Sequence, residues 1–311
     1  MASQKDIKDR ISSVKNIKQI TRAMEMVAAA RLRKAQERIE ILRPYADAIR
    51  RMTRQAVEAA DTMPDFPILQ EHESMDRVGI LLVTGDRGLA GPFNSQILRA
   101  GTTRGKEIGR EEGHDVAWFA SGKRGASSLA FRGLNLEDSW SGFTDRPTYS
   151  DARDIAQGLI AQYTDGKVDR VEVFYNGFES ALSQVVRHET LLPLQQAELV
   201  GDEDEEDGGD EDAEKVEDAE GRDHRRSLWI YEPGPEEILE RLAPDYVEIS
   251  IYRALLESTA SEHGARMTAM RSASDNASEL LDDLQLAANR QRQADITQEL
   301  LEIVAGAEAL N

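Results

Sequence analysis

The first sixty residues of this 311-residue chain predict one long helix. Residues 3–60 contain no glycine and only one proline, Pro44, and they are rich in residue types that favour helices. Apolar or small side chains recur in ten steps over 35 residues, a mean of 3.5, which is the period of a coiled coil. These positions are Ile7, Ile11, Val14, Ile17, Thr21, Met24, Ala28, Leu32, Ala35, Ile39 and Leu42. At about 1.5 Å per residue, the helix would be roughly 85 Å long.

The carboxyl-terminal end of the chain has the same character. After Pro244 there is no further proline, and glycine occurs only at 264 and 306. A helical stripe rich in alanine consists of Val247, Ile251, Leu255, Ala269, Ala273, Ala277, Leu280, Leu284, Ala287 and Leu301. Small side chains bury little apolar area, so a helix this long needs a partner. We therefore predict that residues 1–60 and 235–311 form an antiparallel coiled coil.

The middle of the chain, residues 77–234, has the pattern of an α/β domain. Short apolar runs at 77–84, 115–120 and 168–178 are typical of buried strands, and helical segments lie at about 94–112, 122–131 and 148–164. Further strands are expected at 182–194 and 228–231. Strands that alternate with helices favour a parallel or mixed, Rossmann-like sheet with helices on its faces. The predicted fold is an α/β domain inserted into a long coiled coil.

Charge is distributed unevenly along the chain. The net charge is −20, but residues 202–220 alone hold 13 Asp or Glu and one Lys, whereas residues 1–54 hold 14 Lys or Arg and six Asp or Glu. The acidic insert at 201–223 cannot bury apolar area, so we expect a disordered, solvated loop. The basic first helix fits an acidic partner protein, and nucleic acid is the weaker alternative because no aromatic residue occurs before Tyr45.

Several classes of protein are disfavoured. The chain has no cysteine, which excludes disulfides, thiolate zinc sites and a cysteine nucleophile. No apolar stretch approaches 18 residues, and the start has neither signal-peptide nor transit-peptide character. The five histidines show no metal-ligand spacing, and no GxSxG segment is present. We expect no metal, no cofactor and no catalytic residues.

Two glycine-containing segments resemble phosphate-binding loops only weakly. Residues 84–94 follow the first strand but lack both the GxGxxG and the Gly-Lys-Ser/Thr patterns, and Pro92 removes a backbone donor. Residues 121–125 lack the upstream glycine of such loops. Tight-turn packing and a helix start are the favoured interpretations. The alternative that stays open is a coiled-coil adaptor whose α/β body binds a nucleotide.

Several segments resemble one known family, the γ subunit of F-type ATP synthase. Residues 5–38 and 290–307 are similar to the two ends of that subunit, and 77–94, 191–194, 231–235 and 257–277 also resemble it. The acidic insert departs from the family pattern. The missing cysteines separate the chain from the plastid form, which has a redox-regulated pair, and the missing transit segment makes it look bacterial.

The resemblance implies a rotor shaft without a catalytic site of its own. In the family, the coiled coil stands inside a hexamer of three α and three β subunits, and the body docks with the ε subunit on the membrane ring of c subunits. Proton flow turns the ring and the shaft together, and this drives ATP synthesis. The expected location is peripheral, on the cytoplasmic face of the cell membrane, with contact to the membrane only through the complex and none with nucleic acid.

The resemblance also marks five positions of this chain. Met24 matches a position that faces the β subunit, and Arg292, Gln293 and Thr297 match positions that contact a β loop near the top of the shaft. Glu232 matches a position in the foot near the c ring. For each of these residues the plain alternative is an ordinary coiled-coil or turn residue.

Overall fold

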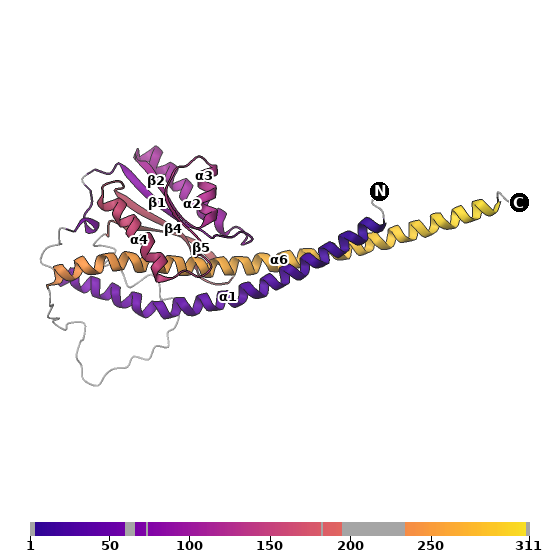
Figure 1. The fold of residues 1–311 in the computed structure, drawn as a ribbon, viewed down its shortest axis with the longest axis horizontal. Helices are drawn as coiled ribbons and strands as arrows, with labels where there is room; N and C mark the ends of the chain where they lie inside the picture. The colour runs from indigo at the N-terminus through magenta and orange to yellow at the C-terminus, as the bar shows by residue number, and fades with distance from the viewer. Residues whose placement is uncertain (1–3, 60–65, 73, 182, 195–233, 309–311) are drawn as a thin grey trace, which may run out of the picture.

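Two long antiparallel helices dominate the computed structural model, which describes residues 4–59, 66–72, 74–181, 183–194 and 234–308. Helix α1 spans Gln4–Ala59 and helix α6 spans Pro235–Glu308. Both chain termini lie at the same end of this pair, and the α/β body lies beside its other half (Figure 1). The predicted fold class is confirmed. Helix α1 also continues through Pro44.

The residues of α1 that face α6 follow a strict heptad pattern, with alternating steps of four and three. The buried or half-buried positions are Ile7, Ile11, Val14, Lys18, Thr21, Glu25, Ala28, Leu32, Ala35, Ile39, Leu42, Ala46, Ile49, Thr53 and Ala56. Fourteen steps cover 49 residues, so the period of 3.5 is confirmed over a longer range than predicted.

Two positions of the predicted stripe on α1 are wrong by one residue. Ile17 is 52% exposed, and Lys18 takes its place in the seam. Met24 is only half-buried, whereas Glu25 is buried. The predicted stripe follows the apolar side chains, whereas the observed 3.5-residue repeat places two charged residues, Lys18 and Glu25, in the seam.

The stripe on α6 needs a similar correction. Val247, Ile251 and Leu255 are buried as predicted, but Leu280 and Leu301 are exposed. Ala287 is also exposed. The seam in this half of α6 instead passes through the buried or half-buried residues Met270, Ser274, Ala277, Leu281, Leu284, Ala288, Gln291 and Asp295. These positions repeat in alternating steps of four and three, as on α1.

The body contains a five-stranded mixed sheet in the order β3-β2-β1-β4-β5. The strands are β1 (Arg77–Val83), β2 (Asp115–Ser121), β3 (Leu136–Trp140), β4 (Arg170–Phe178) and β5 (Gln184–Leu192). Strand β1 is parallel to both of its neighbours, β2 and β4, and only β5 is antiparallel, to β4. Helices α2 (Phe93–Glu107), α3 (Lys123–Phe131) and α4 (Tyr149–Thr164) connect the parallel strands.

Helix α6 belongs to the body as well as to the coiled coil. Alternate residues of β1 point to opposite faces of the sheet, so Leu81 packs with α4 and α6, and Leu82 packs with α2 and α3. Val247, Ile251 and Leu255 of α6 are part of the first of these two cores. Each fully buried side chain of this size contributes about 1.5–3 kcal/mol. The shaft is therefore anchored in the core of the body.

Most of the predicted elements of the body are confirmed, with differences in detail. Strand β3 was missed because its sequence, LEDSW, is polar at an edge of the sheet where three of the five residues are exposed. The helix predicted at 94–112 is α2 followed by a π-helical turn, Ile108–Glu112, which ends at Gly113 with φ of 75°. The predicted strand 228–231 and the insert 201–223 lie outside the described residues.

Among the described residues, none of the helices is long and apolar enough to span a membrane.

Two glycines with positive φ allow a matched test of the turn that begins α3. A Cβ at Gly122, whose φ is 100°, would stand 2.1 Å from the carbonyl oxygen of Thr84, whereas a Cβ at Gly133, whose φ is 72°, would meet nothing within 4 Å. We expect Gly133→Ala to lower the free energy of unfolding by about 1 kcal/mol through backbone strain alone. Gly122→Ala should lower it by about 3 kcal/mol or more. Denaturant unfolding of the full chain measures both, and equal losses would contradict the packing described for this turn.

Candidate functional site

Polar groups of the loop 84–94, which follows β1, accept hydrogen bonds from the start of α3. The Asp86 carboxylate accepts a hydrogen bond of 3.0 Å from the backbone N–H of Lys123, the first residue of α3. The next two N–H groups of α3 donate to the carbonyl oxygen of Gly85 and to the hydroxyl of Thr84. Protein oxygens thus occupy the helix N-terminus that a phosphate would need. The interpretation of 121–125 as a helix start is confirmed, and that of 84–94 as a tight turn stays a prediction.

Helix α6 fills the place where a doubly wound sheet usually binds its ligand. That place lies outside the carboxyl ends of the strands where the strand order reverses, here between β1 and β4. The Ser261 hydroxyl of α6 donates to the carbonyl oxygen of Asn176 in β4 at 3.0 Å. On the β1 side, a Cβ added to Gly85 would come within 2.8 Å of the Glu262 carboxylate. The crevice is occupied by the shaft itself.

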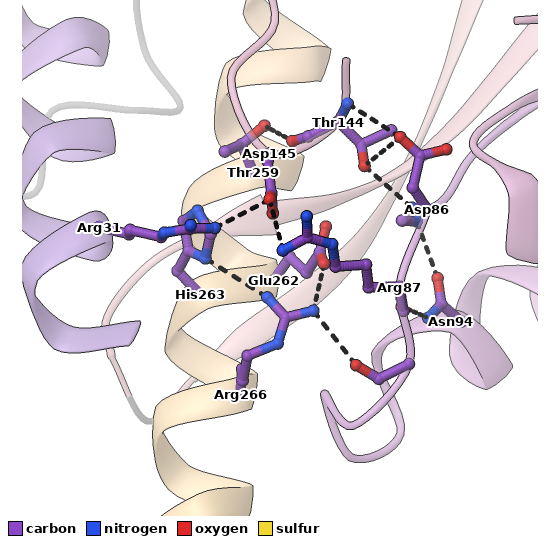
Figure 2. A network of polar contacts seen from close by, with 12 residues as sticks. Arg31, Asp86, Arg87, Asn94, Thr144, Asp145, Thr259, Glu262, His263 and Arg266 are labelled. Carbon is purple, nitrogen blue, oxygen red and sulfur yellow. Dashed lines mark hydrogen bonds and ion pairs between the residues drawn. The ribbon is translucent and has the colours of Figure 1, made fainter. Parts of the chain in front are cut away.

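A polar cluster joins α1, α6 and the body at this crevice (Figure 2). We call it the junction network, and its members are Arg31, Arg87, Asp145, Glu262, His263 and Arg266. The carboxylate of Asp145, which precedes α4, forms ion pairs with Arg31 of α1 at 2.8 Å and with Arg87 of the β1–α2 loop at 3.0 Å. On α6, Arg266 pairs with Glu262 and donates to the carbonyl oxygen of Gly88 at 3.3 Å.

Burial and neighbouring charge act differently on the acids and the histidine of the junction network. Burial alone would raise the pKa of Asp145, but the hydrogen bond from Arg31 and the charges of Arg31 and Arg87 lower the pKa overall. For Glu262, burial raises the pKa despite the pairing with Arg266. Burial and the charge of Arg266 lower the pKa of His263 to about 4, so this ring is neutral at pH 7. Asp145 is therefore the acceptor that stays charged between α1 and the body.

An open groove of about 590 Å³ lies next to the junction network, between α1 and the β1–α2 loop. Its apolar lining includes Ile20, Met24 and Val27 of α1 and Leu89 of the loop. Ile20, Val27 and Leu89 are exposed large side chains, and Leu89 has a φ of 63°, which is uncommon for a residue other than glycine. We call this surface the Met24 groove.

The lining of the Met24 groove also contains basic side chains. Its charged residues are Arg31, Arg87, Arg124 and Arg266. Asp145 and Glu262 of the junction network engage three of these guanidinium groups on one side. A groove lined by apolar and basic side chains suits a partner that has apolar side chains and carboxylates.

The outer end of α6 carries three of the other residues marked by the resemblance. The helix runs on past the first residue of α1 (Figure 1). Arg292, Gln293 and Thr297 are exposed there, and the Thr297 hydroxyl donates to the carbonyl oxygen of Gln293 at 2.9 Å. Leu301 and Ile303 of the same stretch are 65% and 67% exposed. Exposed large apolar side chains on one stretch of helix are typical of a surface that another protein covers.

The structure separates these residues into two groups. Met24 lies at the junction of shaft and body, whereas Arg292, Gln293 and Thr297 lie at the free end of the shaft. Glu232 lies outside the described residues. Sequence reasoning missed the junction network, because Arg31 and Asp145 are 114 positions apart and nothing in their local sequence relates them.

The whole chain is similar to known proteins. A family model described as ATP synthase matches residues 3–310. An ATP synthase gamma chain of Moorella thermoacetica is 41% identical over 310 residues, which cover 100% of both chains. Another from Rubrobacter xylanophilus is 42% identical over 313 residues, with 100% of this chain and 99% of the relative covered.

Solved structures show the same architecture. A chain from the central stalk and c-ring of the Tetrahymena thermophila mitochondrial ATP synthase is 26% identical, with a TM-score of 0.55, over 82% of this chain and 99% of that chain. A chain from the Euglena gracilis mitochondrial ATP synthase has a TM-score of 0.65 over 99% of this chain and 94% of that chain. The latter is 18% identical and shows the fold alone.

The contact between Arg31 and Asp145 can be measured by a double-mutant cycle. Because both side chains are partly exposed, we expect a coupling free energy of about 0.5–1 kcal/mol between Arg31→Ala and Asp145→Ala, which decreases at high salt. The exposed pair Arg33–Glu37 within α1, at 3.6 Å, is the control and should couple by about 0.3 kcal/mol. Unfolding of the full chain in denaturant gives both values. Strictly additive losses for Arg31 and Asp145 would show that this contact does not hold α1 to the body.

Proposed function

This chain belongs to the ATP synthase gamma-chain family, and on that basis we propose that it turns as a shaft that couples proton flow to ATP synthesis or hydrolysis. As a gamma subunit it is part of the central stalk of an F-type ATP synthase. The finer proposal is that three α and three β subunits surround the shaft, and that a membrane ring of c subunits drives it.

The observation that carries this proposal is the double role of α6. One continuous helix of 74 residues forms half of the coiled coil and also supplies part of the body's core. A torque applied to the body therefore reaches the outer end of the shaft without passing through a flexible connection. The junction network adds a second link, from the body to α1. These links support a mechanical role.

A shaft of this kind works by differential contact rather than by chemistry. Three chemically identical β subunits cannot hold different states unless something asymmetric contacts them. A single pair of helices does so, because each orientation stabilises a different state at each of the three sites. We assign the chain no reaction of its own, and partner surfaces are the sites on which its function depends.

Two surfaces fit the proposed contacts with β subunits. The Met24 groove, with its apolar and basic lining, suits an acidic and partly apolar segment of β. At the free end of the shaft, Arg292, Gln293 and Thr297 are exposed and can hydrogen-bond a β loop. The exposed apolar side chains of that stretch would be covered by the surrounding hexamer.

The opposite end of the molecule is the proposed foot. There we propose contacts with the ε subunit and the c ring, with Glu232 among the contacting residues. The Tetrahymena thermophila relative comes from a structure of a central stalk with its c-ring, which supports this arrangement. The chain would then lie on the cytoplasmic face of the membrane and touch it only through the complex.

The alternative function, an adaptor whose body binds a nucleotide, has less support. Within the described residues, Ser261 and Glu262 of α6 fill the crevice between β1 and β4. A nucleotide would have to displace the shaft from the body. A shift in the melting temperature of the isolated chain on titration with ATP would support the adaptor instead.

Co-expression with the cognate α and β subunits tests the proposal directly. A tag on this chain should purify a complex of three α, three β and one copy of the chain that hydrolyses ATP, while the chain alone does not. The measurements are subunit stoichiometry and ATPase activity. A chain that purifies alone, or that binds ATP by itself, would overturn the proposal.

Coupling should depend on the side chain at Met24. We expect Met24→Lys to uncouple proton movement from catalysis while ATP hydrolysis continues, because the added charge would face carboxylates of β. The readout is ATP-driven proton pumping divided by ATP hydrolysis in membrane vesicles. Met52→Lys is the matched control, since Met52 is an exposed methionine near the other end of α1. Normal pumping by the Met24 variant would contradict a contact with β at this position.

A further inference from the structure

We propose that Glu25 is a positioning residue that sets the register of α1 against α6 in the outer half of the shaft. The structural part of this proposal stands on the contacts within the chain. Only its consequence for coupling rests on the proposed function.

The Glu25 carboxylate is the meeting point of both helices. Glu25 occupies a seam position and is 7% exposed. One carboxylate oxygen accepts from Arg271 of α6 at 3.0 Å, and the other accepts from Arg22 of α1 at 3.2 Å. Both oxygens of a buried acid are thus paired, one across the seam and one within α1. A polar residue at a seam position is known to select one register of a coiled coil at some cost in stability.

The seam residues next to Glu25 contribute little to the choice of one register over another. On α1, the seam positions before Glu25 are Lys18 and Thr21, and the position after it is Ala28. On α6, Ser274 and Ala277 are the nearest buried positions beyond Met270. Small and polar side chains of this kind bury little apolar area, so they discriminate weakly between registers one heptad apart. The inner half of the seam is different, because it packs against large residues such as Leu242 and Ile249.

A shift by one heptad would break the pairing of Glu25 in either direction. One heptad from Arg271 on α6 lie Gly264 and Ser278, so Glu25 would face a residue without positive charge. One heptad from Glu25 on α1 lie Lys18 and Leu32, so Arg271 would face another cation or an apolar side chain. A buried acid without its partner is strongly disfavoured. Among these nearest alternatives, only the observed register pairs opposite charges.

The register matters because Met24 is the residue next to Glu25. Successive residues of a helix point about 100° apart, so the angle at which Glu25 enters the seam also fixes where Met24 points. With Glu25 in the seam, Met24 lines the groove beside the β1–α2 loop. A shift by one heptad would keep Met24 on the same face of α1 but move it by about 10 Å along the shaft, and would also shift the level of α1 against the exposed end of α6.

Disulfide scanning can read the register directly, since the natural chain has no cysteine. A cysteine at Thr21 is combined, in separate full-length variants, with a cysteine at Met270, Ser274, Ala277, Leu281 or Leu284. With Glu25 present we expect one dominant cross-linked position. The Glu25→Leu variant has leucine at two successive equivalent seam positions, 25 and 32. In this variant, cross-linking to the α6 position seven residues from the dominant one should rise at least threefold relative to the dominant cross-link. Glu25→Gln should show the same spread if the leucine variant fails to fold.

The controls separate register from general stability. Glu37→Leu replaces an exposed glutamate of α1 that lies outside the seam, and its cross-linking pattern should not change. Exchange of all three charges, Glu25→Lys combined with Arg22→Glu and Arg271→Glu, should restore the single dominant position. An unchanged single position in Glu25→Leu and Glu25→Gln, or no recovery in the charge exchange, would overturn the proposal.

The consequence for coupling is measured separately. In the assembled complex, Glu25→Leu should lower the ratio of proton pumping to ATP hydrolysis at least twofold. The cross-links are read in the full chain, both alone and within the complex, so they test the register even if the chain has another function. A spread in cross-linking with a normal pumping ratio would retain Glu25 as the register residue and refute its link to Met24.

Discussion

The whole structure depends on the burial of α6 on two sides. One side of this helix packs along α1, and the other packs on the sheet of the body, where Val247, Ile251 and Leu255 are part of the core. A helix of this length that buries few large apolar side chains in its outer half would not be stable by itself. Because the inner half of α6 is held by the body, it provides a fixed surface on which α1 packs. The body, the shaft and the contact between them are therefore one cooperative unit rather than separate domains.

The strength of packing changes along this unit. Near the body, the seam and the core bury large side chains, and polar contacts such as Arg31–Asp145 add links between α1 and the body. Farther out, the seam contains Thr21, Ser274 and Ala277, and charged residues take seam positions. Beyond the first residue of α1, α6 continues without that partner (Figure 1). The chain is thus most stable by itself at the body and most in need of a partner at the outer end, where we propose that the hexamer surrounds it.

Much of the fold was predictable because periodicity and composition report directly on helices and buried strands. The coiled-coil period, the α/β body and four of the five strands follow from local sequence. The phase of the seam did not, because Ile17 and Met24 are apolar whereas the true seam residues, Lys18 and Glu25, are charged. Strand β3 was missed because an edge strand can be polar. A strict count of alternating fours and threes, applied without regard to hydrophobicity, could have found Glu25.

The candidate site was less accessible from sequence for a physical reason. The junction network joins α1, two loops and α6, and its pairs span distances such as the 114 positions between Arg31 and Asp145. No local pattern encodes such a contact, which arises only when the helices dock on the sheet. The resemblance to a family marked Met24 and the exposed end of α6 without indicating where they lie in the fold. The structure adds that these residues belong to two surfaces at different levels of one shaft.

The occupied crevice of the sheet has one further consequence. In related architectures a diffusing small molecule binds at this place, and the protein alternates between empty and loaded forms. Here the occupant, residues 261 and 262 of α6, is covalently part of the chain, so its effective concentration is high and cannot be diluted. The crevice of the body is therefore occupied whenever α6 is packed on the sheet. A small molecule could bind there only in competition with this tethered segment, and the contact between shaft and body forms without any ligand.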